Sequence, residues 1–246
     1  MMVKMFVMIP RDRKVSRQEF HDHWRHPHAT LGLGLSGVAG RVQSHQIDCG
    51  HLAADQARFE AIGEAWFESI DDALGMAEDE HYTTQLQPDE RHFIDLERLD
   101  FLFCTEEVVV ERATEEDGVN PLDAQWCERD RPTSIKLMQF VPRGSEPWTR
   151  DEDRTLGLRV GALRHVRAHG SGSTRGGQSQ WRGVRELWWP TRWDFEAGVA
   201  RDREAWVRLQ GTAGGTALSL LTFSERWHSR RPAQPERCAS EPATER

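Results

Sequence analysis

The sequence contains the same pattern twice, and this duplication limits the folds that the chain of 246 residues can adopt. Val3–Arg11 (VKMFVMIPR) aligns with Ile135–Arg143 (IKLMQFVPR). Three more pairs of blocks follow in the same order: Gly40–His45 with Arg164–His169, Ile62–Ala73 with Val184–Phe195, and Cys104–Val109 with Phe223–His228. Internal repetition of this kind indicates one structural unit that is used twice.

The first copy shows the order of its helices and strands. Val3–Ile9 is rich in residues that favour strands and is stopped by Pro10. Ser16, followed three residues later by Glu19, forms a capping-box signature for a helix that runs to about Leu33. We expect strands at residues 38–47, 57–68 and 101–110, a second helix from residue 69, and a short turn or helix from residue 88. This order is β-α-β-β-α-β, the ferredoxin-like plan.

A single ferredoxin-like sheet leaves one face uncovered, and a second copy in the same chain can cover it. We therefore predict an α+β fold of two fused ferredoxin-like repeats that form one pseudo-dimeric barrel. The predicted repeats are residues 1–110 and 134–228, joined by an acidic linker at 111–133 and followed by a disordered tail at 229–246. Whether such chains pair further as homodimers is left open.

Composition and charge exclude several classes of partner. The net charge is −8 and there is no basic stripe, which argues against nucleic acid. No apolar run approaches the ~18 residues that a membrane span needs. The N-terminus lacks the features of a signal peptide. The four cysteines are scattered without a C-x-x-C pair, which indicates a reducing cytoplasm.

The stretch EFHDHWRHPH (Glu19–His28) holds four histidines, which allows three interpretations: a metal site, a catalytic site or a solvated helix face. Residues three, four and seven apart share one helix face, so the four rings cannot converge on one ion. No H-E-x-x-H spacing is present, and we predict no metal and no cofactor. We expect His21 and His26 to be solvated, and His28 to point inward with Trp24.

Histidine suits proton transfer without a metal because its ordinary pKa is ~6.5. Pro27 directly precedes His28 and is expected to interrupt the helical hydrogen bonds there. The resulting kink would aim the His28 ring.

The motif S-x-x-E-F-x-x-x-W-x-x-x-H (Ser16–His28), followed by GVAGRVQSH, FEAIGEAWFES and DERHFIDL, resembles the EthD family of the dimeric α+β barrel superfamily. AIGEAWF and His28 are particularly similar to methylmuconolactone methylisomerases. The likeness covers nearly all of residues 3–110, whereas the second copy resembles the family only through its strands. The resemblance implies a small-molecule cavity at the first helix.

The resemblance also implies roles for particular residues. His28 would be catalytic, with His81 and Tyr82 as a second-rank pair that is similar to one in superfamily cyclases. Arg41 stands where the similar methylisomerases carry a tyrosine, which favours an anionic or oxygen-rich substrate. The candidate substrate-binding residues are His23, Trp24, Arg41, Gln43, His45, Gly63, Ala65 and Phe67.

The second copy differs from the first where the histidines would lie. It is shorter between its first two strands and has no counterpart of HDHWRHPH. Leu187 and Trp189 replace Ala65 and Phe67, so we expect the second cavity to be filled. Glu64 has a counterpart, Glu186, in this copy, and both are therefore expected to be structural and to pair beneath the helices.

Together with these residues, the resemblance implies a cofactor-independent lyase or isomerase (of the dehydratase, cyclase or decarboxylase type) for a small aromatic, polyketide or lactone-like compound. Two alternatives remain. One is a cofactor-free monooxygenase of quinols or phenols, in which the substrate itself activates O₂. The other is an EthD-like accessory protein that binds a ligand without catalysis.

Overall fold

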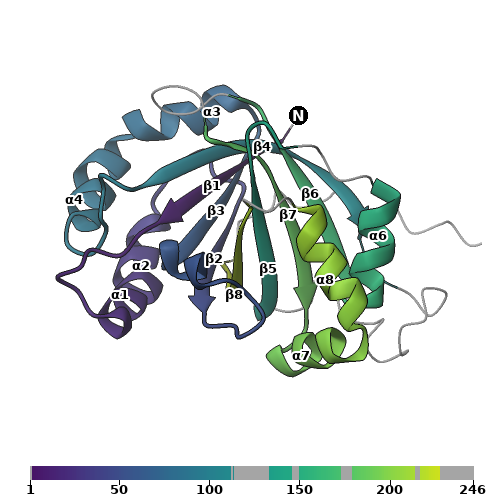
Figure 1. Ribbon diagram of the computed structural model, residues 1–246. Coiled ribbons are helices and arrows are strands. Elements are labelled where there is room, and N and C mark those ends of the chain that lie inside the picture. Colours follow the sequence, from purple (N-terminus) through teal and green to yellow (C-terminus); the bar gives the residue numbers. More distant parts are fainter. Residues whose placement is uncertain are drawn as a thin grey trace, which may run out of the picture.

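The computed structural model describes residues 2–111, 113, 133–145, 150–172, 179–213 and 217–227. Within them, eight strands form one closed barrel in the order β1-β3-β2-β8-β5-β7-β6-β4, and the helices lie outside it in two groups (Figure 1). The eight-stranded barrel with outer helices is as expected. Nearly all of the predicted linker and the whole predicted tail fall outside the described residues.

The first half places its helical segments between strands in the expected order. β3 begins later than predicted, because residues 54–58 form a short 3₁₀ helix ahead of it. The elements are β1 (Val3–Ile9), α1 (Arg17–His23), η1 (Trp24–His28), α2 (Ala29–Gly32), β2 (Gly40–Ile47), η2 (Ala54–Arg58), β3 (Ala61–Phe67), α3 (Ile70–Gly75), η3 (Met76–Glu78), η4 (Tyr82–Leu86), α4 (Gln87–Glu90) and β4 (Asp100–Val110).

The second half contains β5 (Thr133–Pro142), α6 (Arg150–Arg159), β6 (Arg164–Gly170), β7 (Trp181–Trp189), α7 (Arg192–Arg201), α8 (Arg203–Thr212) and β8 (Leu218–Trp227). Its strands pair as β8-β5-β7-β6, and those of the first half pair as β4-β1-β3-β2. Antiparallel pairs β2–β8 and β4–β6 join the halves. No helix among the described residues is long and apolar enough to cross a membrane.

Strand register shows which positions correspond in the two halves. Lys4 lies opposite Trp66, and Lys136 lies opposite Trp188, as the aligned blocks require. The last block is aligned one residue wrongly, because Lys4 also faces Cys104 whereas Lys136 faces Thr222 rather than Phe223. A slip of one residue in a strand moves every side chain to the other face of the sheet.

The barrel interior contains an apolar cluster and a buried group of charges. The apolar cluster includes Phe6, Met8, Met138 and Phe140. The buried charges belong to Lys4, Lys136, Glu64 and Glu186, and a partly exposed fifth group, Glu106, contacts Lys4.

The position of Glu64 and Glu186 corrects one expectation. They do not pair beneath the helices but share two lysines inside the barrel. Lys4 Nζ lies 2.8 Å from Glu64 Oε2 and 2.7 Å from Glu186 Oε2. Lys136 Nζ lies 2.8 Å and 3.2 Å from the same two carboxylates. Successive side chains on a strand point to opposite faces of the sheet, so Glu64 points into the barrel because its neighbour Ala65 faces the helices.

Candidate active site

The helix that carries the histidines changes its winding near Pro27. Its start is capped as predicted, since Ser16 Oγ accepts a hydrogen bond from the Glu19 backbone and Glu19 accepts one from the Ser16 backbone. Trp24–His28 then form a π-helical turn. Pro27 has no N–H for the usual bond to the His23 carbonyl, and the next available donor is one residue later. Single π turns are frequent at functional sites.

The π turn brings His23 and His28 to the same carboxylate. His23 Nε2 lies 2.8 Å from Asp89 Oδ1, and His28 Nδ1 lies 2.9 Å from Asp89 Oδ2. In a regular α-helix, residues five apart would point ~140° away from each other. Regular α-helical spacing predicts instead that His28 lies close in direction to His21, seven residues away, and that prediction is wrong.

A cavity of about 130 Å³ lies between this helix and the outer face of the sheet. β1, β2 and β3 supply its floor, and segments from η1 to the loop after α2, together with η4 and α4, supply its walls. Most of the lining is aliphatic or aromatic. The principal polar side chains that line it are those of His28, Arg41, Gln43, Tyr82 and Glu90.

The His28–Asp89 pair is arranged for proton transfer. Burial alone would raise the pKa of Asp89, but hydrogen bonds from His28 and His23 outweigh it and lower the pKa below the ordinary value. An ionised carboxylate only accepts hydrogen bonds, so His28 Nδ1 must carry the proton that it shares with Asp89. This leaves Nε2 of His28 as the basic atom available to a ligand. The Phe93 ring packs against His28 with centroids 5.3 Å apart and supports its orientation.

A second polar pair lies near the first. The Tyr82 hydroxyl donates to Glu90 Oε2 at 3.1 Å. Tyr82 begins the π-helical segment η4, and Glu90 ends α4, one residue after Asp89. Two carboxylates on one short helix therefore orient two potential proton-transfer groups at the same cavity.

The floor of the cavity combines small residues with two polar ones. On β2, Arg41 lies opposite Ala65 and Gln43 lies opposite Gly63 in the register with β3. Gln43 Nε2 donates to the Trp24 carbonyl at 2.7 Å. Of the predicted site residues, seven line the cavity: Trp24, His28, Arg41, Gln43, Gly63, Ala65 and Tyr82.

The other four predicted site residues lie away from the lining. His23 packs on Phe93 and bonds Asp89. Phe67 is fully buried among side chains of β1, α3 and β4. His81 Nε2 donates to the Leu31 carbonyl at 2.7 Å, and its ring covers Gly34. The fourth, His45, belongs to a separate polar cluster.

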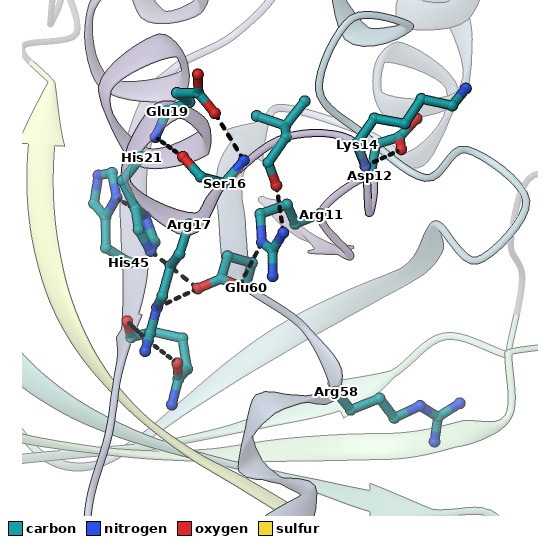
Figure 2. Close-up of polar contacts among 12 residues, drawn as sticks. Arg11, Asp12, Lys14, Ser16, Arg17, Glu19, His21, His45, Arg58 and Glu60 are labelled. Atoms are coloured by element: carbon teal, nitrogen blue, oxygen red, sulfur yellow. Dashed lines mark hydrogen bonds and ion pairs between the residues drawn. The ribbon is translucent and has the colours of Figure 1, made fainter.

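That cluster centres on Glu60, which Figure 2 shows receiving contacts from Arg11, Arg17 and His21. His21 Nδ1 lies 2.9 Å from His45 Nδ1, and burial is the main reason that the pKa of His45 is lowered. His45 packs against Trp24, with ring centroids 4.7 Å apart, and does not reach the cavity. His21 is 15% exposed, so the expectation that it is solvated is wrong, whereas His26 is exposed as expected.

The second half carries larger side chains at the positions that match Gly63, Ala65 and Phe67. Arg185, Leu187 and Trp189 on β7 are completely buried. Trp189 Nε1 donates to the Val160 carbonyl at 3.0 Å. These side chains occupy the space that Gly63, Ala65 and Phe67 border in the first half.

Sequence reasoning missed Asp89 and Glu90, although both stand in the segment QPDERHFIDL. That segment is expected to form a turn or short helix and contributes to the EthD-like motif, but neither carboxylate is among the predicted site residues. A signal was present, since two adjacent carboxylates directly after a proline at a helix start lie where they can meet side chains of a neighbouring helix.

Comparisons with known proteins agree with the resemblance inferred from the motifs. Residues 12–97 match the family model of the EthD domain. No curated protein matches the sequence. One similar solved structure is an EthD family protein from Bacillus halodurans C-125, which is 16% identical, covers 42% of this chain and 96% of its own, and has a TM-score of 0.35.

Two other solved structures are similar over more of the chain. One is a protein provisionally described as a monooxygenase from Fusobacterium nucleatum, 6% identical, with 93% of this chain and 95% of that chain covered and a TM-score of 0.48. The other is a variant of chlorite dismutase from Candidatus Nitrospira defluvii, 11% identical, with 90% of each chain covered and a TM-score of 0.46.

Proposed function

We propose that the cavity is the active site of a cofactor-independent lyase or isomerase, and the match of residues 12–97 to the EthD domain model supports this proposal. His28, Arg41, Gln43, Tyr82 and Glu90, the principal polar side chains of the lining, all belong to this segment. The substrate is a small ring compound with an acidic C–H or O–H group. His28 is the general acid and base.

The observation that carries this proposal is the 2.9 Å contact between His28 Nδ1 and Asp89 Oδ2 beside an apolar cavity. Nε2 of His28 removes a proton from carbon next to a carbonyl group. The imidazolium then returns that proton to another atom of the substrate in an isomerase, or to the leaving group in a lyase. Asp89 stays ionised and stabilises the imidazolium throughout.

Two further features support this assignment. The apolar walls limit water near the reacting atoms, which strengthens the electrostatic effect of the polar pairs. The Tyr82 hydroxyl, oriented by Glu90, is a second group with which a substrate oxygen can exchange a hydrogen bond.

We also infer that the two halves are fused ferredoxin-like repeats. The shared strand order and the matched positions of Lys4 with Lys136 and of Trp66 with Trp188 support this inference. The second half is then the scaffold that closes the barrel, while the first half holds the chemistry.

The experiment that tests the function is proton exchange in D₂O. Cyclic ketones, lactones and ring-substituted keto acids are incubated with the protein, and deuterium incorporation is followed by proton NMR. The variants are His28→Asn and, as the matched control on the same helix, His26→Asn. His26 is exposed and is not among the residues that line the cavity.

Wild type and His26→Asn should exchange at least one class of compound, and His28→Asn should lose roughly a hundredfold or more of that rate. Oxygen consumption in parallel samples that contain quinols or phenols would instead indicate the monooxygenase alternative. Ligand binding without exchange or oxygen uptake, unchanged in His28→Asn, would refute catalysis and leave a binding protein.

A further inference from the structure

Arg41 places a positive charge on an otherwise largely apolar cavity floor. Its guanidinium donates to the Gly32 carbonyl, and within the described part of the chain no carboxylate lies within ion-pair distance of it. Burial lowers the pKa of Arg41 from its ordinary value, but a guanidinium remains charged in proteins. A partly buried cation with only a carbonyl partner is incompletely stabilised.

Among the described residues, the two arginines that are buried each contact a carboxylate. Arg185, at the position that corresponds to Gly63, has Nη1 2.5 Å from Asp153 Oδ1 and Nε 2.9 Å from Gln139 Oε1. Arg167, which corresponds to Gln43, has Nη2 2.7 Å from Glu107 Oε2. On β6 and β7, the counterparts of β2 and β3, carboxylates therefore neutralise the guanidinium groups.

The surroundings of Arg41 leave room for an anion from outside. Ala65 lies opposite Arg41 in the strand register, and Gly63 follows at the next floor position on β3. Glu90 also lines the cavity, but it lies on the helical wall and accepts a hydrogen bond from the Tyr82 hydroxyl. Glu64 is turned into the barrel toward Lys136.

Cavity size limits what can accompany the anion. A volume of about 130 Å³ is close to that of an engineered protein cavity of ~150 Å³ that binds benzene. The space therefore suits one ring with small substituents rather than a fused polycyclic compound.

We propose that Arg41 binds the carboxylate of a single-ring organic acid, whose ring lies over Gly63 and Ala65 and whose reacting atoms face His28. The planar guanidinium can form two parallel hydrogen bonds with a carboxylate, which fixes the orientation of the ring as well as its charge. This inference rests on the proposed function only in taking the cavity as the ligand site.

The test compares benzoate with benzamide, which has nearly the same shape but no charge. Affinities are measured by titration calorimetry for wild type, Arg41→Gln, Gly32→Ala and the matched control Arg208→Gln. Arg208 is exposed on α8 and pairs with Glu152, far from the cavity lining. A Cβ on Gly32 would meet Arg41 Nη1 at 2.7 Å, so Gly32→Ala displaces the guanidinium without removing its charge.

Wild type and Arg208→Gln should bind benzoate more tightly than benzamide. Arg41→Gln should lose roughly tenfold to a hundredfold of benzoate affinity and keep its benzamide affinity. Gly32→Ala should weaken benzoate binding in the same direction by a smaller factor.

Equal affinity of the two compounds for wild type, no binding of either, or an unchanged benzoate preference in Arg41→Gln would overturn the proposal. The measurement is an equilibrium one, so it is independent of catalysis. His28→Asn should retain the benzoate preference even if it loses proton exchange, and a failure of the catalytic proposal is then separate from a failure of this one.

Discussion

Asp89 Oδ2 accepts a hydrogen bond from His28 Nδ1 at 2.9 Å across 61 residues of chain. The contact depends on two local features, the π turn at Pro27 and the helix α4 that starts after Leu86. It selects one of the four clustered histidines as the group with a free basic nitrogen at the cavity. Of the other three, His21 contacts Glu60, His23 contacts Asp89 Oδ1, and His26 faces solvent.

Replacing Asp89 by Asn should slow proton transfer without unfolding the protein. Asn can still occupy the site, but it cannot stabilise the imidazolium that forms when His28 takes a proton. We expect the exchange rate in D₂O to fall by at least about tenfold, in line with groups that orient a catalytic or metal-binding histidine. The matched control is Asp22→Asn on the exposed face of α1, which should retain the wild-type rate.

Asp89→Asn should also change how the stability of the folded protein depends on pH in the acidic range. The pKa of Asp89 is lowered in the folded protein, so its contribution is present above the ordinary carboxyl pKa and is lost as pH falls. Wild type should therefore lose its stability advantage over the variant on acidification. If the difference in melting temperature between wild type and Asp89→Asn stayed constant as pH fell below the ordinary carboxyl pKa, the contacts of Asp89 with His28 and His23 would be contradicted.

Substitutions at corresponding positions should separate the cavity from packed core. Ala65→Trp should abolish benzoate binding and cost at most ~1–3 kcal/mol of unfolding free energy, because the cavity accepts added bulk. Trp189→Ala should cost ~3–5 kcal/mol and leave binding largely intact, since Trp189 is fully buried. Urea denaturation and calorimetry measure both. If only Trp189→Ala lost benzoate binding, the site would lie in the second half of the chain, contrary to this account.

The carboxylates inside the barrel should differ in how much they contribute to the free energy of unfolding. Lys136 and Lys4 overcome the effect of burial on Glu64 and lower its pKa to about 2. Burial and repulsion from Glu64 and Glu106 outweigh the lysines at Glu186 and raise its pKa to about 7. Three carboxylates surround two ammonium groups, and Glu186 is the one that retains a proton most readily.

Glu64→Gln should therefore cost ~3–5 kcal/mol at neutral pH, as breaking a buried ion pair does, whereas Glu186→Gln should cost much less. Because the folded-state pKa of Glu186 is raised, wild-type stability should decrease as pH rises from about 4.5 to about 7. Glu186→Gln should flatten that decrease in urea titrations. Equal costs for the two variants would refute the assignment.

Arg41 and Arg185 should respond in opposite ways to the same substitution. Arg41→Met removes an incompletely stabilised charge and should leave the melting temperature unchanged or raise it. Arg185→Met leaves Asp153 buried without its main partner and should cost ~3–5 kcal/mol. Thermal unfolding of the ligand-free variants checks this, and a large loss of stability in Arg41→Met would mean that Arg41 is structural.

The order of strands and helices could be predicted from local signals. Pro10 ends the first strand, and Ser16 with Glu19 caps the first helix, both within a few residues of their effect. Alternation along β3 groups Gly63 with Ala65, and the resemblance to the EthD family implied that Arg41 on β2 joins them at the cavity. The barrel followed from duplication, since each sheet needs a partner to cover its inner face.

The details of the site depended on contacts that the sequence pattern does not contain. The π turn alters which helix positions share a face, so His23 rather than His21 joins His28. The role of Asp89 depends on the contact between two helical segments that are distant in the sequence, so it could not be predicted from the sequence pattern. Glu64 and Glu186 could be identified as a matched pair, but Lys4 and Lys136 draw them into the barrel rather than beneath the helices.

The most direct test of the account is the tautomer of His28. In protein with ¹⁵N-labelled histidine, two-bond couplings distinguish protonated from unprotonated ring nitrogens at a pH well above the ordinary histidine pKa of ~6.5. We predict that Nδ1 of His28 carries the proton and Nε2 is bare in wild type, and that Asp89→Asn reduces the population of this tautomer. A wild-type His28 protonated at Nε2 would contradict the claim that this histidine presents a base to the cavity.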